Sequence, residues 1–168
     1  MHRSRLYLIV SILLAAVALD QAVKEIVRSS LDLGESVHVF GPLSIVHVAN
    51  TGSVFGIGQG YVIVPTIASI VILVALPLAL RRAHTRFGYV PTRPEAVFIG
   101  LVAGGAVGNL IDRIAYSSVT DFIDVELLPG IHWPAFNVAD SCIVVGTLVL
   151  VFLLQRRGVF DATPDSAG

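Results

Sequence analysis

The sequence predicts an integral membrane α-helical protein with four transmembrane helices and a small extracytoplasmic β-sheet segment between spans one and two. Hydrophobic residues make up 55% of the 168 residues and charged residues only 14%, and the mean hydropathy is +0.82. These values lie outside the usual range of soluble globular domains. Four apolar runs of membrane-spanning length recur along the chain.

The first apolar run, Leu6 to Leu19, leaves two interpretations open. It follows two arginines and ends in small residues, Ala16-Val17-Ala18, which is the order of regions in a secretory signal peptide. The helical pattern also continues to Val27, so that an uncleaved span of roughly 20 residues, at about 6–27, is equally available.

Residues 34–58 differ in character from the apolar runs. Two short β-branched runs, 37–40 and 43–48, flank Gly41-Pro42. A Gly-Pro pair between two such runs is typical of a turn. We therefore predict a small hairpin-like sheet outside the hydrocarbon.

The other three spans are predicted at about 61–80, 96–115 and 136–154, and residues 116–134 are predicted as an acidic loop. Gly100, Gly104 and Gly108 recur at four-residue spacing in the third span, which predicts a flat strip where another helix approaches closely. We predict one membrane domain, 1–157, followed by a mobile cytoplasmic tail, 158–168.

The charges indicate the topology. Four spans place both termini on one side, and most basic residues fall on that side: Arg3, Arg5, Arg81, Arg82, Arg86, Arg93, Arg156 and Arg157. The positive-inside rule makes that side cytoplasmic. Acidic residues gather at the other edge: Asp20, Glu25, Asp32, Glu35, Asp112, Asp121, Asp124, Glu126 and Asp140. We expect the functional site at this outer edge.

Two aspartates bracket the loop between the last two spans. Asp121 follows the third apolar run and Asp140 opens the fourth, so successive helices carry both to the same edge. Asn137 and Asp140 have the spacing of a helix cap and its third position, so capping explains both without chemistry. Asp121 has no such explanation, and its plain alternative is a solvated loop carboxylate like Asp124.

Polar residues in the first and third spans also have two interpretations. Asp20 and Lys24 are one helical turn apart, which predicts an ion pair near the interface. Asn109 and Arg113 share a helix face, with Asp112 beside it. Arg113 can extend to headgroup phosphates, or this group can hold a substrate carbonyl or a carboxylate.

Metal and nucleophile chemistry find no support in the sequence. His38, His47 and His132 lack the close spacing of metal ligands, so we predict no metal and no cofactor. The single cysteine, Cys142, excludes a disulfide within one chain. No serine stands in a recognisable nucleophile arrangement.

Five motifs in order carry a resemblance to a known family: Asp20-Gln21 with Lys24, Asn50-Thr51-Gly52 with Phe55, Gly105 to Arg113, Val119-Thr120-Asp121-Phe122, and Phe136-Asn137-Val138-Ala139-Asp140. Over this length the chain strongly resembles the lipoprotein signal peptidases, or signal peptidase II. The resemblance implies an aspartyl endopeptidase of the bacterial inner membrane that retains its first span. Such an enzyme removes the signal peptide from prolipoproteins just before a diacylglyceryl-modified cysteine.

The resemblance also implies a site. Asp121 and Asp140 match the catalytic pair, and the matching supporting residues are Asp20, Lys24, Asn50, Gly52, Asn109, Asp112, Arg113 and Asn137. Expected partners are diacylglyceryl-prolipoproteins, membrane lipids and globomycin-type inhibitors, with no nucleic acid and no obligatory protein partner. Val23 and Ser53 depart from the family pattern and leave inhibitor sensitivity and substrate preference open.

Two rival functions remain. In a transporter or ion pathway, Asp20, Asp112 and Asp140 would relay protons or cations, and such groups should be spread along the bilayer depth rather than clustered at one edge. An assembly or chaperone-like membrane protein needs no paired acids. A carboxylate pair, in contrast, suits peptide hydrolysis, because the ionised member activates water and the protonated member donates to the oxyanion.

Overall fold

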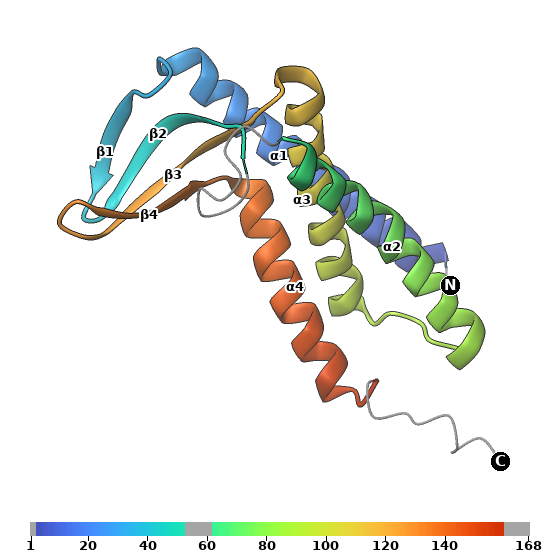
Figure 1. Cartoon of the computed structure of the whole chain (residues 1–168). Helices are drawn as coiled ribbons and strands as arrows, with labels where there is room; N and C mark the ends of the chain where they lie inside the picture. The colour runs from blue at the N-terminus through green and yellow to red at the C-terminus, as the bar shows by residue number, and fades with distance from the viewer. Residues whose placement is uncertain (1–2, 53–61, 160–168) are drawn as a thin grey trace.

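The computed structural model describes residues 3–52 and 62–159. Four helices form a bundle with a sheet at one end (Figure 1): α1 Arg3–Ser30, α2 Ile63–Phe87, α3 Arg93–Tyr116 and α4 Val138–Arg156. Each helix is long and apolar enough to cross a membrane. The predicted four-span fold is confirmed, and α1 continues without a break beyond the small residues near its middle.

Helix α3 lies at the centre of the bundle, where it packs against α1, α4 and α2. Its glycines allow this close packing, as the sequence predicts. A Cβ added at Gly104 would lie 2.8 Å from the Ala16 Cβ of α1, and one at Gly105 would collide with the Ala139 carbonyl oxygen of α4. Gly108 likewise faces the Asp20 carboxylate. Helices α1 and α4 therefore pack so closely against α3 that their backbone atoms lie next to its glycines.

The sheet is antiparallel and has the strand order β1-β2-β3-β4. Its strands are β1 Ser36–Phe40, β2 Leu43–Asn50, β3 Val119–Leu128 and β4 Ile131–Phe136. The predicted first hairpin is present, with Gly41-Pro42 at its turn. Residues 53–58 of the predicted segment lie outside the described residues, as do Ser53, Phe55 and 160–168 of the predicted tail.

The prediction of a loop at 116–134 is wrong, because this segment contributes β3 and most of β4. Acidic residues at alternate positions concealed the strand: Asp124 and Glu126 point to one face, while Ile123 and Val125 point to the other. The fourth helix accordingly begins at Val138 rather than at Phe136, which belongs to β4.

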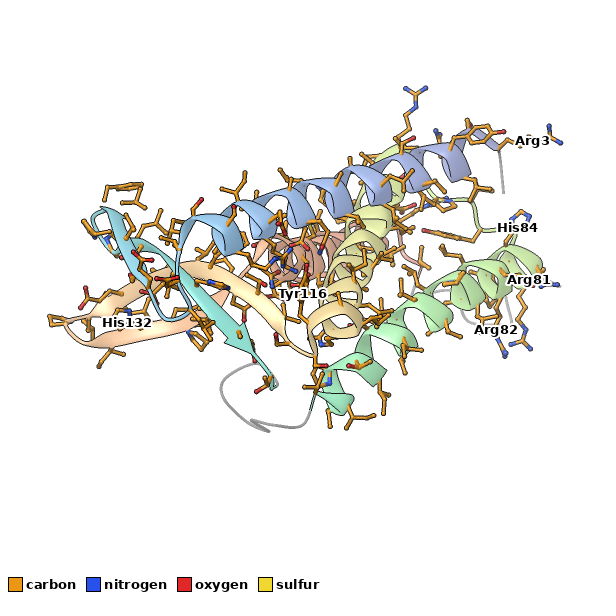
Figure 2. All side chains as sticks on the ribbon, turned by 90° about the horizontal axis from the view of Figure 1, so that it is seen from above. Arg3, Arg81, Arg82, His84, Tyr116 and His132 are labelled. Atoms are coloured by element: carbon orange, nitrogen blue, oxygen red, sulfur yellow. The ribbon has the colours of Figure 1, made fainter. Side chains whose placement is uncertain are left out.

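Charged groups mark the two ends of the bundle. Figure 2 places Arg3, Arg81 and Arg82 at the end away from the sheet, and His132 at the sheet end. At the arginine end, the buried Glu95 carboxylate accepts hydrogen bonds from Tyr89 and Arg157. These contacts tie the start of α3 to the end of α4.

Gly105→Ala should weaken the protein by about 1 to 3 kcal/mol, because the new methyl group pushes α4 away from α3. The thermal midpoint of the detergent-solubilised chain measures the change. Ile114→Ala is the matched control on the same helix, since its side chain is 77% exposed. Equal midpoints for the two variants would contradict the close α3–α4 approach.

Candidate active site

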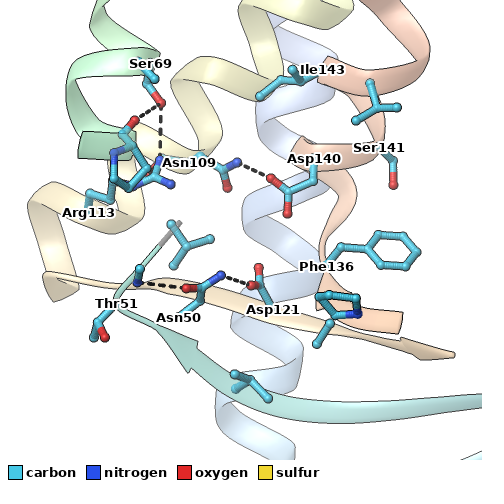
Figure 3. A pocket seen from close by; sticks show the side chains of 18 of the residues that line it. Asn50, Thr51, Ser69, Asn109, Arg113, Asp121, Phe136, Asp140, Ser141 and Ile143 are labelled. Carbon is cyan, nitrogen blue, oxygen red and sulfur yellow. Dashed lines mark hydrogen bonds between the residues drawn. The ribbon is translucent and has the colours of Figure 1, made fainter. Parts of the chain in front are cut away.

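A cavity of about 930 Å³ lies where the sheet meets α2, α3 and α4. Asp121 and Asp140, called the aspartate pair below, both line it. Figure 3 shows their carboxylates pointing into the same space, one from β3 and the other from the first turn of α4. The remaining wall is largely apolar and comes mainly from α2 and α4, with Val64, Ala68, Ile72, Ile143 and Val144.

Asp140 is held by the start of its own helix and by α3. The Asn137 side chain accepts a hydrogen bond from the Asp140 amide at 2.8 Å, and Asp140 Oδ2 accepts one from the Asn137 amide at 3.3 Å. The predicted capping is therefore confirmed. Asp140 Oδ1 accepts from Asn109 Nδ2 at 2.7 Å. Asp140 thus takes part in the helix cap and also lines the cavity.

Asp121 is only 2% exposed and lies in a strand, so the alternative of a solvated loop carboxylate is wrong. Its Oδ1 accepts from Asn137 Nδ2 at 2.6 Å and its Oδ2 from Asn50 Nδ2 at 2.8 Å. Asn50 is oriented in turn by the Gly52 amide, which donates to its Oδ1. Asn137 therefore contacts both members of the aspartate pair.

Burial raises the pKa of Asp121 to about 7, and the negative charge of Asp140 adds to the effect. Hydrogen bonds from Asn50 and Asn137, with the positive charge of Lys24, oppose the rise. Asp121 can consequently exchange a proton near neutral pH.

Lys24 lies behind the pair, fully buried among acidic side chains. Its Nζ is 2.8 Å from Asp20 Oδ2 and 3.2 Å from Asp112 Oδ2, and it donates to Asn109 Oδ1 at 3.1 Å. The predicted Asp20–Lys24 ion pair is confirmed, and it is part of a larger interior cluster.

The two carboxylates bound to Lys24 also hold the backbone beside the aspartate pair. Asp20 Oδ1 accepts from the Ala139 amide, and Asp112 Oδ2 accepts from the Thr120 amide, each at 2.9 Å. These amides belong to the residues immediately before the two aspartates. Lys24 therefore connects the carboxylate that holds the start of α4, Asp20, to the carboxylate that holds β3, Asp112.

Arg113 points into the cavity, whereas the adjacent Asp112 points to Lys24. Arg113 lines the cavity and donates to Ser69 Oγ at 3.3 Å and to the Asn109 carbonyl at 3.2 Å. Its guanidinium forms no ion pair within 4.0 Å with a carboxylate of the described residues. Its positive charge is therefore directed into the cavity, where it attracts the Asp140 and Asp121 carboxylates across space rather than through a direct ion pair.

Three positioning contacts come from residues that sequence reasoning did not assign to the site. Gln21 Nε2 donates to Asp112 Oδ1, and Arg28 donates to the Thr120 hydroxyl. Ser69 contacts Arg113 from α2. A usable signal existed for Ser69, a polar residue in an apolar span, and for Arg28, one turn beyond Lys24.

Two histidines at the sheet end have partners away from the cavity: His132 Nδ1 lies 2.9 Å from Asp124 Oδ2, and His47 contacts the Leu31 carbonyl. Within residues 3–52 and 62–159, no group of three His, Cys, Asp or Glu side chains could hold a metal ion.

Comparisons with known proteins show the family to which the chain belongs. The sequence profile of the family described as Signal peptidase (SPase) II matches residues 12–156. The chain belongs to the signal peptidase II family. A lipoprotein signal peptidase of Desulforapulum autotrophicum is 38% identical over 156 residues, covering 89% of this chain and 90% of the relative. One from Serratia marcescens is 37% identical over 169 residues, covering 96% and 94%.

A solved structure also matches this member of the signal peptidase II family. It is described as a bacterial membrane enzyme, and it superposes with a TM-score of 0.74 at 28% identity over 95% of this chain and 94% of its own. The chain therefore shares its fold with a solved bacterial membrane enzyme over nearly its whole length.

Lys24→Met should destabilise the protein by about 3 to 5 kcal/mol, because it leaves two buried carboxylates without their shared cation. The double variant Asp20→Asn/Lys24→Met should recover part of this loss, since it removes one negative charge with the positive one. Thermal midpoints in detergent compare the two, with Glu25→Gln on the exposed side of α1 as control. A double variant less stable than Lys24→Met would contradict the charge balance.

Asp121→Asn should become more stable relative to the wild type as pH rises. The raised pKa means that the folded wild type holds the Asp121 proton more tightly than the unfolded chain. Its contribution to stability is complete below about pH 4 and is lost as pH rises through about 7. The difference should grow by about 1 to 4 kcal/mol between pH 4 and pH 8.

Unfolding midpoints across this pH range test the prediction. Asp32→Asn, at an exposed position between α1 and β1, gives the baseline for removing one carboxylate. A pH-independent difference between Asp121→Asn and wild type would be inconsistent with a buried, titrating Asp121.

Proposed function

We propose that this chain is a membrane aspartyl endopeptidase that removes the signal peptide from diacylglyceryl-modified prolipoproteins, cutting just before the modified cysteine. The family and the names of its relatives support lipoprotein signal peptide cleavage. One structural observation supports the aspartyl mechanism: two carboxylates from separate elements face one cavity and share a hydrogen-bonding partner, Asn137.

The aspartate pair supplies both functions that peptide hydrolysis requires. Two nearby carboxylates do not ionise together easily, so the pair retains one proton over a range of pH. The ionised member removes a proton from a water as it attacks the scissile carbonyl, and the protonated member donates to the developing oxyanion. As the C–N bond breaks, the former base gives its proton to the leaving amine, and a hydroxyl of the tetrahedral intermediate returns a proton to the other carboxylate, which restores the pair.

The amide and guanidinium groups have supporting roles in this proposal. Asn50 and Asn137 fix the Asp121 carboxylate, and Asn109 fixes that of Asp140. Arg113 offers its remaining donors to a substrate carbonyl, because its positive charge faces the cavity. Gly52 holds Asn50, while Asp20, Lys24 and Asp112 hold the backbone behind the pair.

The cavity wall fits a substrate that carries acyl chains. Its apolar residues come from α2 and α4, and lipid can reach the space between these two helices. Its polar groups lie under the sheet. An acylated cysteine can therefore place its chains between these helices while its peptide bond reaches the aspartate pair. Globomycin-type cyclic peptides would occupy the same space.

We place the protein in the bacterial inner membrane, with both termini cytoplasmic and the sheet at the outer face. Arginines gather at the end opposite the sheet, which the positive-inside rule assigns to the cytoplasm (Figure 2). A relay function finds less support, because Asp20, Asp112 and Asp140 meet at one end of the bundle instead of lining its length.

Asp121→Asn and Asp140→Asn should each reduce cleavage by at least about 100-fold, because neither single carboxylate can act as both base and acid. The purified variants are incubated with a diacylglyceryl-prolipoprotein, and mass spectrometry follows the loss of the signal peptide. Asp124→Asn, which faces away from the cavity on the same strand, is the matched control. Wild-type rates for either pair variant would exclude the proposed mechanism.

A further inference from the structure

The outer part of the sheet has two chemically different faces. Cross-strand partners put their side chains on the same face, so the register defines each row. Two apolar rows cross all four strands: Val37, Ile45, Ile123 and Phe136, and then Phe40, Leu43, Val125 and Trp133. Leu128 and Ile131 extend this apolar face at the β3–β4 turn.

The opposite face is polar. It carries His38, Ser44 and Asp124 in one row and the cross-strand pair Glu126 and His132 in the next. His38 and Phe40 are two residues apart and would share a face in a regular strand, but an irregularity in β1 between them places them on different faces. In these rows near the hairpin turns the sheet therefore separates apolar from polar side chains, as expected where one side faces water and the other an apolar medium.

The described protein leaves much of the apolar face exposed. Val37 is 49% exposed, Phe40 66%, Leu128 61% and Ile131 55%. Figure 1 shows why: the sheet extends away from the bundle, and its two hairpin turns lie farthest from the helices. A contiguous apolar surface of this kind marks an interaction site.

The direction of the apolar face identifies its partner. Asp121 stands two residues before Ile123 on β3 and so shares this face, and Trp133 and Phe136 line the cavity above α2 and α4. The apolar face thus looks toward the side on which the helices run. Beyond the bundle, that side is occupied by the lipid around the four spans.

We propose that the apolar face rests on the lipid leaflet that surrounds the sheet end of the bundle. The sheet then lies along the membrane surface with its polar face in water. Its apolar side chains continue the lipid-contacting surface of the helices, and a tryptophan at this depth suits the aromatic preference of the interface. This placement does not depend on the proposed peptidase activity.

Tryptophan fluorescence in liposomes tests the placement, because Trp133 is the only tryptophan. In a Trp133→Phe background, Phe40→Trp probes the apolar face and His38→Trp probes the polar face of the same strand. Neither position lines the cavity, so a lipid bound in the cavity does not quench either probe. Phosphatidylcholine with brominated acyl chains reports lipid contact, and aqueous iodide reports water contact.

The placement predicts that brominated lipid quenches Phe40→Trp several times more strongly than His38→Trp, whereas iodide quenches mainly His38→Trp. Bromines near the headgroups should quench Phe40→Trp more than bromines near the chain ends. Equal quenching of both probes by brominated lipid would overturn the proposal. So would a Phe40→Trp probe shielded from both quenchers, which would indicate that protein, such as a second copy, covers the face.

If Phe40→Trp fails to fold, Leu128→Trp in the same background takes its place at the other hairpin turn. Its expected response is the same, and iodide quenching of Leu128→Trp without quenching by brominated lipid would again overturn the proposal.

Discussion

The arrangement of the site depends on one buried cation between two buried anions. Lys24 lies within 3.2 Å of both Asp20 and Asp112, and none of the three side chains is exposed to solvent. Charges in such surroundings are tolerated only when they are paired and hydrogen-bonded. Each anion also accepts a hydrogen bond from a backbone amide beside one member of the aspartate pair, Asp20 through its other oxygen and Asp112 through the same oxygen that contacts Lys24. The cluster therefore fixes the relative position of β3 and α4.

Close helix packing makes this cluster possible. Gly104 lets α1 approach α3, and Gly105 lets the start of α4 approach the same helix from another side. Asp20 can then reach the Ala139 amide across the interface, a contact between residues 119 positions apart in the chain. The sheet completes the site, because β3 delivers Asp121 and β2 delivers Asn50 to the same cavity. Helices and sheet are thus joined through the aspartate pair.

The sequence predicted the parts of the fold that local patterns determine. The length of the apolar runs predicted the four spans, and the spacing of polar residues predicted the Asn137 cap and the Asp20–Lys24 pair. The four-span topology predicted that Asp121 and Asp140 lie at one edge. It did not predict β3, because acids on its polar face imitate a solvated loop. It also could not predict that Lys24 reaches Asp112, since no periodicity encodes a contact between distant helices.

The pH dependence of kcat/KM on a diacylglyceryl-prolipoprotein tests the central claim most directly, that two coupled carboxylates carry out the hydrolysis. The measurement uses the full chain in detergent or lipid. A pair that must hold one proton predicts a bell-shaped profile whose two apparent pKa values belong to the pair, with activity falling as pH rises above about 7. A profile that rises through neutral pH and stays at its maximum in alkaline solution would contradict this account.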